Sequence, residues 1–410
     1  MAPELRSVDA HLQRIFDRVA PLPPYEQPLL EALGLPICED VVAPIDLPRF
    51  DNSGMDGYAV RSVDVAGASD EQPVRLPVVG EIGAGQSKVY ALSPGTALKI
   101  MTGAPVPYGA DAVVPVEWTN HGFADVLIRR SPLSGQHVRP RGEDVEVGDV
   151  LLEQGTLMGP REIGLLAAVG RSQARSRPRP RVVVMSTGNE LREPGSALAS
   201  DSVFDANSFA LAASARAAGA IAYRVGIVSD DPEEFADALS DQLVRADAVV
   251  TSGGVSRGDY DVVKEVLGNL GTVDFYDVAM QPGKPQGFGT VGEDETPIFA
   301  LPGNPVSAYV SFEVFVLPAL RRMMGRLPYR RPQVRATCLD PIRSAPGKRQ
   351  FVRGDFCIEP QGAQVGVVGG HGSHLMGDLA RANALIVVPE DTTQVGAGDT
   401  VHVLVVDREF

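Results

Sequence analysis

The stretch "TSGGVSRGDYDVVK" at residues 251–264 decides how the middle of this chain folds. It follows the apolar run "ADAVV" at 246–250, which is typical of a strand buried in a parallel sheet. Glycines, hydroxyl side chains and the carboxylates of Asp259 and Asp261 come next, before a helix can begin. Flexible backbone, hydroxyls and carboxylates at the end of a buried strand predict a site for a phosphate-bearing ligand with a divalent ion.

Strand and helix patterns alternate around this stretch. Strand-like "RVVVMSTGNEL" at 181–191 precedes helical "NSFALAASARAAG" at 207–219, and strand-like "AIAYRVGIVSDD" at 220–231 precedes helical "PEEFADALSDQLVRA" at 232–246. This order predicts βαβ units and a mostly parallel sheet in a three-layer α/β/α domain. Short β-rich pieces separated by Gly and Pro lie before and after it. The fold class is therefore α/β multidomain, with β-rich modules on both sides of the central domain.

Four polar loops follow strands of the predicted sheet: "STGNEL", "SDD", "TSGGVSRGDYD" and "ALPGNPVS". Taken singly, the two glycines indicate a turn and the paired aspartates a helix cap. Loops at the carboxyl ends of parallel strands meet at one edge, however, so together they favour a phosphorylated-ligand site. The candidate residues there are Ser186, Thr187, Glu190, Asp230, Asp231, Ser252, Gly253, Gly254, Ser256, Asp259, Asp261, Pro302, Pro305 and Ser307. The chain has no Walker A pattern and no G-x-G-x-x-G after the first strand, which argues against the common ATPases and Rossmann dehydrogenases, and "MSTG" is not the G-x-S-x-G nucleophile elbow.

Composition narrows the function classes further. The chain has 410 residues, 44% of them apolar, which suits two to four domains. A net charge of −15 leaves no basic field for nucleic acid. The three scattered cysteines suit neither a disulfide framework nor a zinc site and indicate a reducing, cytoplasmic location. No signal peptide or membrane span is expected.

Two further features favour ordinary explanations when they are taken alone. His371 and His374 in "GGHGSH" have metal-like spacing but few other candidate ligands nearby, so we expect loop histidines. The run "RSQARSRPRPR" at 171–181 is interpreted as a connector rather than a nucleic-acid site. Lys284 in "QPGKPQG" is the candidate cation near the sheet edge, because a lysine flanked by glycine can reach an oxyanion as a point charge.

Several motifs resemble one known family. "TSGGVSRGDYD", "MQPGKP" and "ALPGNPVSA" are similar to the molybdopterin-binding domain, which also occurs in molybdopterin adenylyltransferases and in a family of hydrolases. "DNSGMDGYAV" at 51–60, "MTGAP" at 101–105, "RGEDV" at 141–145 and "FVRGDF" at 351–356 narrow the choice. With them the chain resembles, over nearly its whole length, the molybdopterin molybdenumtransferase family, which is the bacterial MoeA type and includes the gephyrin E domain.

The resemblance implies that molybdate is inserted into adenylylated molybdopterin with release of AMP, assisted by Mg²⁺ or a similar divalent ion. It implies metal or substrate carboxylates at Glu190, Asp230 and Asp261, with Asp259 as a rival to Asp261. Gly253, Gly254 and Ser256 would hold the phosphate, beside Ser186, Thr187, Pro302 and Pro305. The implied molybdate pocket consists of Lys284, Ser307, Arg353 and Ser373, and the arginine suits an oxyanion because its fork donates two bonds.

The family's domain organisation is implied as well. An elongated domain would contain residues 1–44 and 138–174, and a β-rich insertion would contain 45–137. The molybdopterin-binding domain would span 175–328, and a C-terminal β barrel 329–410. Asp56, Thr102 and Asp144 in the first modules would complete the partner's site across a homodimer; the equally supported alternatives are a turn aspartate at Asp56 and a capping aspartate at Asp144. Further candidate partners are a molybdopterin adenylyltransferase and recipient molybdoenzymes, with neither nucleic acid nor membrane among them.

The chain departs from the family pattern near "PGKP". Some relatives carry lysines where this sequence has Asp277 and Gln281, and Arg257 is a hypothetical source of the missing charge. Two other classes of function fit parts of the sequence. One is a partner-binding scaffold like the gephyrin E domain, which the retained carboxylates disfavour. The other is a lone adenylyltransferase or pyrophosphate hydrolase, which needs little beyond the α/β domain.

Overall fold

The computed structural model describes residues 5–85, 90–255, 262–270, 272–408 and 410. They form two compact units. The first contains residues 1–27, 34–38 and 175–410 and is called the α/β unit here; the second contains 28–33 and 39–174 and is called the β-rich unit. Strands β1 (Tyr25–Pro28) and β11 (Gln173–Ser176) pair with each other, and each straddles the boundary between the units.

The centre of the α/β unit is a six-stranded sheet in the order β15-β12-β16-β20-β19-β17. The strands are β12 (Arg181–Thr187), β15 (Ile221–Val228), β16 (Ala248–Ser252), β17 (Asp274–Asp277), β19 (Pro285–Val291) and β20 (Thr296–Leu301). The first four strands in that order run parallel, whereas β19 pairs antiparallel with β20, and β17 pairs antiparallel with β19 at the edge. Since β15 and β16 lie on opposite sides of β12, the chain reverses its winding there, and such a switch point is where ligands bind in open α/β sheets.

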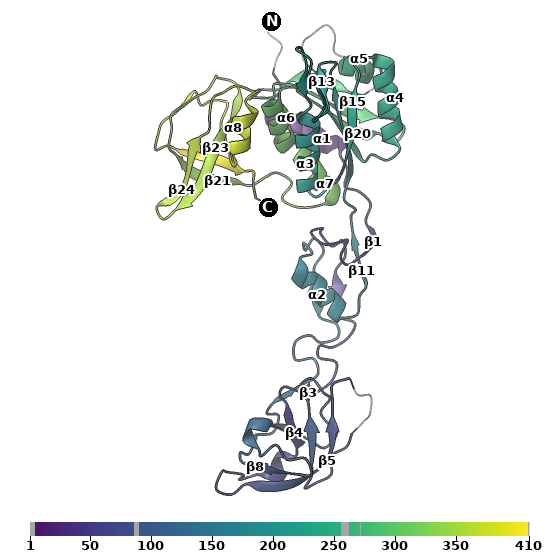
Figure 1. The fold of residues 1–410 in the computed structure, drawn as a ribbon, viewed down its shortest axis with the longest axis vertical. Helices are drawn as coiled ribbons and strands as arrows, with labels where there is room; N and C mark the ends of the chain where they lie inside the picture. The colour runs from purple at the N-terminus through teal and green to yellow at the C-terminus, as the bar shows by residue number, and fades with distance from the viewer. Residues whose placement is uncertain (1–4, 86–89, 256–261, 271, 409) are drawn as a thin grey trace. The chain divides into compact units, whose positions relative to one another are not determined.

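Helices cover both faces of this sheet. Their bounds are α1 (Val8–Arg18), α3 (Asn207–Ala217), α4 (Pro232–Leu243), α5 (Val262–Asn269), α6 (Pro305–Ser311), the π-helical η3 (Phe312–Val316) and α7 (Leu317–Met324). Figure 1 shows α4 and α5 on one side and α1, α3, α6 and α7 on the other. The alternation of β12 explains the two layers, because Val182 and Val184 pack with α3 and α6, whereas Val183 and Met185 pack with α4 and α5.

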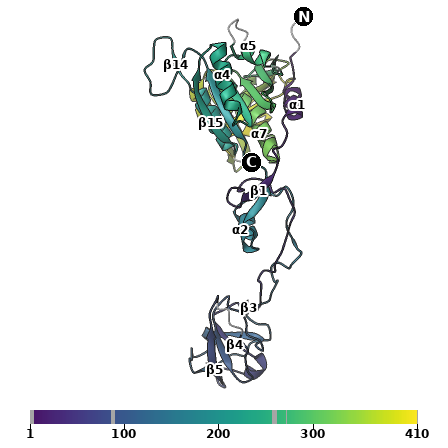
Figure 2. The same cartoon turned by 90° about the vertical axis from the view of Figure 1, so that its right-hand side faces the viewer.

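The C-terminal part of this unit is a small β barrel. Strands β23 (Arg349–Glu359), β24 (Gly362–Val367), β21 (Gln333–Cys338), β27 (Thr400–Val405) and β25 (Ala384–Val388) pair in that order, and β25 closes on β23. The shorter elements are β18 (Met280–Gln281), which pairs with β23, β22 (Ile342–Arg343) with β26 (Gln394–Val395), and α8 (Met376–Arg381). A β13 (Leu191–Arg192) and β14 (Val203–Phe204) excursion projects from the α/β unit in Figure 2.

The β-rich unit contains a mixed five-stranded sheet in the order β7-β4-β6-β5-β8. Its elements are β4 (Gly57–Val60), η1 (Ser62–Val65), β5 (Val74–Ile82), β6 (Ala97–Ile100), β7 (Ala112–Pro115), η2 (Val116–Trp118) and β8 (Asp125–Ile128). Both faces of the sheet carry an apolar core. Short pairs are β2 (Val41–Val42) with β10 (Val150–Leu152) and β3 (Asn52–Ser53) with β9 (Val138–Arg139), and α2 spans Pro160–Ala168.

These observations confirm the predicted fold class: a three-layer α/β/α domain, β-rich N-terminal modules and a C-terminal barrel. The two units group the N-terminus differently from the predicted domain 1–44 plus 138–174. Helix α1 joins the α/β unit because Val8, Leu12 and Ile15 are buried in its core. The boundaries between the predicted domains inside each unit stay predictions. Within the described part of the chain, no helix is both long and apolar enough to cross a membrane.

Candidate functional site

The carboxyl ends of β12, β16 and β20 open into a two-lobed hollow, called the sheet-edge cavity here. Each lobe has a volume of about 330 Å³. The lobes share Thr187, Glu190, Gly253, Gly303 and Asn304. The cavity brings together these predicted residues: Ser186, Thr187, Glu190, Asp230, Ser252, Gly253, Gly254, Pro302, Pro305 and Ser307. The expectation that the four loops meet at one edge of the sheet is therefore confirmed.

Two of the predicted carboxylates, Asp230 and Glu190, line this cavity. The backbone N–H of Asn189 donates to Asp230 Oδ2 at 2.9 Å. Gly188 has φ +150, and a Cβ there would lie 2.6 Å from Glu190 Oε2, so only glycine lets that carboxylate fold back over the loop. The neighbouring Asp231 instead accepts the N–H groups of Glu233 and Glu234 and caps α4. Of the paired aspartates, only Asp230 lines the cavity.

The glycines after β16 are required by the backbone. Gly253 has φ +101, and a Cβ there would lie 2.8 Å from the Thr187 carbonyl oxygen. Gly254 has φ +65, and its Cβ would lie 2.5 Å from Val263 Cγ2. Both conformations are ones that side-chain-bearing residues rarely adopt. The absence of side chains leaves the backbone itself as the cavity wall, as a phosphate cradle needs.

Part of the predicted site lies outside the described residues. Ser256, Arg257, Asp259 and Asp261 fall in the segment 256–261. Among the described residues, no group of three or more His, Cys, Asp or Glu side chains is placed to hold a metal ion. The predicted metal set of Glu190, Asp230 and Asp261 stays a prediction, because one of its three members lies in that segment.

Sequence reasoning missed a buried carboxylate beneath the cavity. Asp205 is 1% exposed, accepts the Ser186 hydroxyl at 3.1 Å and the Ser208 N–H at 3.0 Å, and lies 3.8 Å from Arg224 Nη1. It thereby joins the end of β12 to the start of α3. The cavity is also lined by Asn207, Asn304 and His374, which sequence reasoning did not single out as site residues. The signal for Asp205 was an aspartate three residues before Ser208 at a helix start, which is an ordinary capping pattern.

The predicted oxyanion residues show distinct environments. Lys284 Nζ lies 2.9 Å from Asp277 Oδ2, so the predicted cation forms an ion pair with this aspartate. Ser307 lines the sheet-edge cavity, and the next residue before it, Val306, donates its N–H to the Ser373 carbonyl oxygen at 3.0 Å. These contacts place residues 306–307 beside the loop that contains Ser373.

Arg353 is buried, with 4% of its surface exposed, and burial lowers its pKa. Its terminal nitrogens donate to the backbone carbonyls of Gly372, at 3.0 Å, and Gly370. The fork that we expected to face an oxyanion is thus engaged with the loop that contains Ser373. Arg353 and Gly370 also line a small hollow of about 20 Å³. A direct role of Arg353 as an anion ligand stays a prediction.

The remaining three predicted residues belong to the β-rich unit and are exposed. Asp56 Oδ1 accepts both the N–H and the hydroxyl of Thr102 at 2.7 Å. The bond from the Thr102 backbone lowers the pKa of Asp56, so this carboxylate is kept ionised. Asp144 donates its backbone N–H to the Leu47 carbonyl at 3.0 Å.

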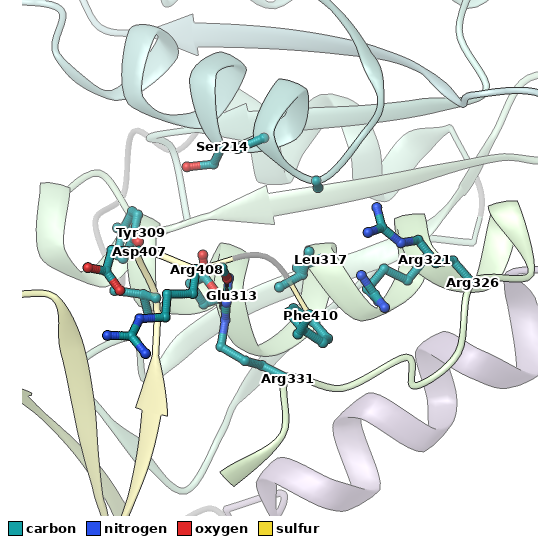
Figure 3. A pocket seen from close by; sticks show the side chains of 13 residues that line it. Ser214, Tyr309, Glu313, Leu317, Arg321, Arg326, Arg331, Asp407, Arg408 and Phe410 are labelled. Atoms are coloured by element: carbon teal, nitrogen blue, oxygen red, sulfur yellow. Dashed lines mark hydrogen bonds and ion pairs between the residues drawn. The ribbon is translucent and has the colours of Figure 1, made fainter. Parts of the chain in front are cut away.

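A second cavity, of about 180 Å³, lies between α3, the α6–α7 segment and the last residues of the chain. Figure 3 shows its charged lining, in which Glu313 faces Arg331 and Phe410 lies between arginines. The Phe410 ring centroid is 3.9 Å from the Arg321 guanidinium carbon and 4.7 Å from that of Arg331. None of the predicted site residues lines this cavity. Its ion pair and stacked ring hold the end of the barrel against the helices.

Comparison with known families identifies every major part of the chain. Residues 6–170 match the MoeA N-terminal region (domain I and II). Residues 183–322 match a probable molybdopterin binding domain, and residues 335–406 match the MoeA C-terminal region (domain IV). The domain with the sheet-edge cavity is therefore the one described as molybdopterin binding.

Similar proteins cover the full length. Molybdopterin molybdenumtransferase 2 of Mycobacterium tuberculosis is 45% identical over 97% of this chain and 99% of its own. Molybdopterin molybdenumtransferase of Haemophilus influenzae is 37% identical over 92% of both chains. A solved structure of the molybdopterin biosynthesis MoeA protein of Pyrococcus horikoshii aligns with a TM-score of 0.81 at 31% identity, covering 99% of this chain and 100% of that one.

Proposed function

This chain belongs to the molybdopterin molybdenumtransferase family, the enzymes of molybdenum-cofactor biosynthesis, and we propose that its sheet-edge cavity is where the transfer occurs. Adenylylated molybdopterin binds across the two lobes, molybdate is inserted at its dithiolene sulfurs, and AMP leaves. The observation that supports this assignment most directly is the shared wall of the two lobes. Backbone at Gly253 and Gly303 lies there beside the Glu190 carboxylate, which suits a pyrophosphate link with a ring system on either side.

We propose Mg²⁺ as the metal, held by Glu190, Asp230 and Asp261. The described part of this set fits, because Glu190 and Asp230 offer only oxygen donors and line the same lobe as Gly253 and Gly254. The ion supplies charge neutralisation for the phosphate that leaves. In this arrangement the Asn189 N–H holds the Asp230 carboxylate, and the missing side chain of Gly188 leaves room for that of Glu190.

For molybdate we propose Lys284, Ser307, Arg353 and Ser373. The contacts favour a division of roles, in which some of these residues position the pocket and do not bind molybdate directly. Arg353 fixes the carbonyls of Gly370 and Gly372, and that loop is bonded to the start of α6, where Ser307 lines the cavity. Lys284 supplies a positive charge that Asp277 partly offsets.

A homodimer, a cytoplasmic location, and contacts with a molybdopterin adenylyltransferase and with recipient molybdoenzymes complete the proposal. The ordered pair of Asp56 and Thr102 is available for a role of this kind, since both residues are exposed. The three free cysteines Cys38, Cys338 and Cys357 suit a reducing compartment. Light scattering over a range of concentrations tests the dimer, and a monomer throughout would exclude it.

The transfer is tested by AMP release from adenylylated molybdopterin with Mg²⁺, with and without molybdate. We expect release that depends on molybdate and is lost in Asp261→Ala. Release without molybdate would identify a hydrolase, and tight binding without release a carrier or scaffold.

The adjacent aspartates provide a matched pair for the metal site. Asp230→Asn removes a carboxylate from the cavity and should raise the Mg²⁺ concentration needed for half-maximal release. Asp231→Asn removes the same charge one residue away, while asparagine still caps α4. Equal Mg²⁺ dependence in the two variants would contradict the assignment of Asp230.

A further inference from the structure

Asn207, the first residue of α3, makes two short hydrogen bonds at the rim of the sheet-edge cavity. Its Nδ2 donates to the Gly303 carbonyl oxygen at 2.6 Å and to Ser252 Oγ at 2.7 Å. A carbonyl oxygen can only accept, so the contact with Gly303 fixes which end of the amide is nitrogen. Both hydrogens of that nitrogen are then used, and the Ser252 oxygen is the acceptor in the second bond.

The direction of that bond determines what the Ser252 hydroxyl can do. A hydroxyl has one hydrogen, and when its oxygen accepts from Asn207 its own O–H must donate elsewhere. Among the described residues no acceptor receives it. Ser252 is 2% exposed and lines the cavity next to Gly253, where the proposed phosphate binds. A buried hydroxyl donor at this place, without an acceptor among the described residues, suits an anionic oxygen of the ligand.

The same amide joins the two backbone walls of the cradle. A Cβ on Gly303 would lie 3.6 Å from Gly253 Cα, and the Gly253 N–H donates to the Leu301 carbonyl at 3.2 Å, so the loops after β16 and β20 lie close together. Asn207, at the start of α3, bridges the two loops by donating to Ser252, which ends β16, and to the Gly303 carbonyl. Loss of this bridge would affect ligand geometry at both walls.

We propose that Ser252 is a phosphate-binding residue and that Asn207 is a positioning residue that sets the direction of its O–H. This inference rests on the proposed function, because it assigns a phosphate oxygen of the nucleotide to the shared wall. Asn207→Asp is the informative change, since a carboxylate has the same shape but no hydrogen to donate. The Ser252 proton would then turn toward the aspartate and away from the ligand.

The test is calorimetric titration of the full chain with AMP and Mg²⁺. Ser252→Ala should weaken AMP binding by about tenfold or more, the loss expected for a hydrogen bond to a charged group. Asn207→Asp should weaken it at least as much. An aspartate also repels phosphate, so Asn207→Asp is repeated in the Ser252→Ala background, where the repulsion remains and the orienting effect is absent. In that background Asn207→Asp should weaken AMP binding clearly less than it does in the otherwise unaltered chain.

Three outcomes separate the possibilities. The inference is supported if the double variant loses less AMP-binding free energy than the sum of the losses in Ser252→Ala and Asn207→Asp. Fully additive losses, or lowered thermal stability with unchanged AMP affinity, would overturn it and leave Asn207 as a structural tie. If the unaltered chain fails to bind AMP, the proposed function itself is wrong. Asn120→Asp, an equal charge change at an exposed residue of the β-rich unit, should leave AMP affinity unchanged.

Discussion

Replacing Arg331 by methionine is expected to destabilise the α/β unit, and by more at neutral than at acidic pH. Arg331 Nε lies 3.0 Å from Glu313 Oε2, and the two side chains are only 10% and 6% exposed (Figure 3). Arg331 Nη1 also donates to the carbonyls of Val405 at 2.9 Å and Arg408 at 2.8 Å. The guanidinium thus ties the end of the barrel to the π-helical turn that contains Glu313.

The expected loss follows from the charge that remains. Removing one partner of a buried ion pair costs about 3–5 kcal/mol when the other stays ionised. Burial already raises the pKa of Glu313 against the attraction of Arg331, and without the arginine the pKa rises further. An acid whose pKa is higher in the native state binds its proton preferentially there. Its contribution to stability is present below the unfolded pKa and is lost as pH rises through the native one. The loss in Arg331→Met should therefore grow with pH.

Urea unfolding at about pH 5 and about pH 8 measures this difference. Circular dichroism follows the α-helices, which in the described part of the chain belong to the α/β unit apart from α2. The single tryptophan, Trp118, belongs to the β-rich unit, so its fluorescence is an internal control that should not change. Glu313→Gln together with Arg331→Met should recover part of the loss, since no charge is then buried. An equal loss at both pH values, with no recovery in the double variant, would refute the reasoning.

The remaining predictions concern charge, pH and backbone conformation. Asp277→Asn should tighten molybdate binding by up to about fivefold at low salt, because it removes the partner of Lys284; titration calorimetry that shows no change would contradict this. Burial lowers the pKa of His11 to about 3, so the unfolded chain binds this proton at a higher pH than the native protein does. The free energy of unfolding should therefore fall by about 2 kcal/mol between neutral pH and about pH 5. Urea titrations of His11→Phe should show a smaller dependence on pH. Gly254→Ala should lower the free energy of unfolding by about 1–3 kcal/mol and weaken AMP binding, because φ is +65 and the new Cβ would collide with Val263. An unchanged free energy of unfolding in urea would contradict the requirement for glycine.

The α/β architecture could be predicted from the sequence because the apolar pattern of each strand and helix is written in residues that are neighbours in the chain. The run 182–185 is apolar on both faces, and strands with helices on each side need that composition. Proline at the start of α4 and Asp231 as its cap were likewise readable from neighbouring residues. The loops that form the sheet-edge cavity could be found for the same reason, since parallel strands bring their carboxyl ends together whatever the side chains do.

Contacts between residues far apart in the chain were decided only by the tertiary structure. The capping pattern at Asp205 did not reveal that this carboxylate is buried beneath the cavity beside Arg224. Nothing near Asn207 in the sequence points to Gly303, whose carbonyl fixes its amide. Arg353 had the right chemistry for an oxyanion, yet its fork is directed at a neighbouring loop. Periodicity records which face of an element is apolar, whereas the direction of a polar side chain depends on the acceptors that folding brings within reach.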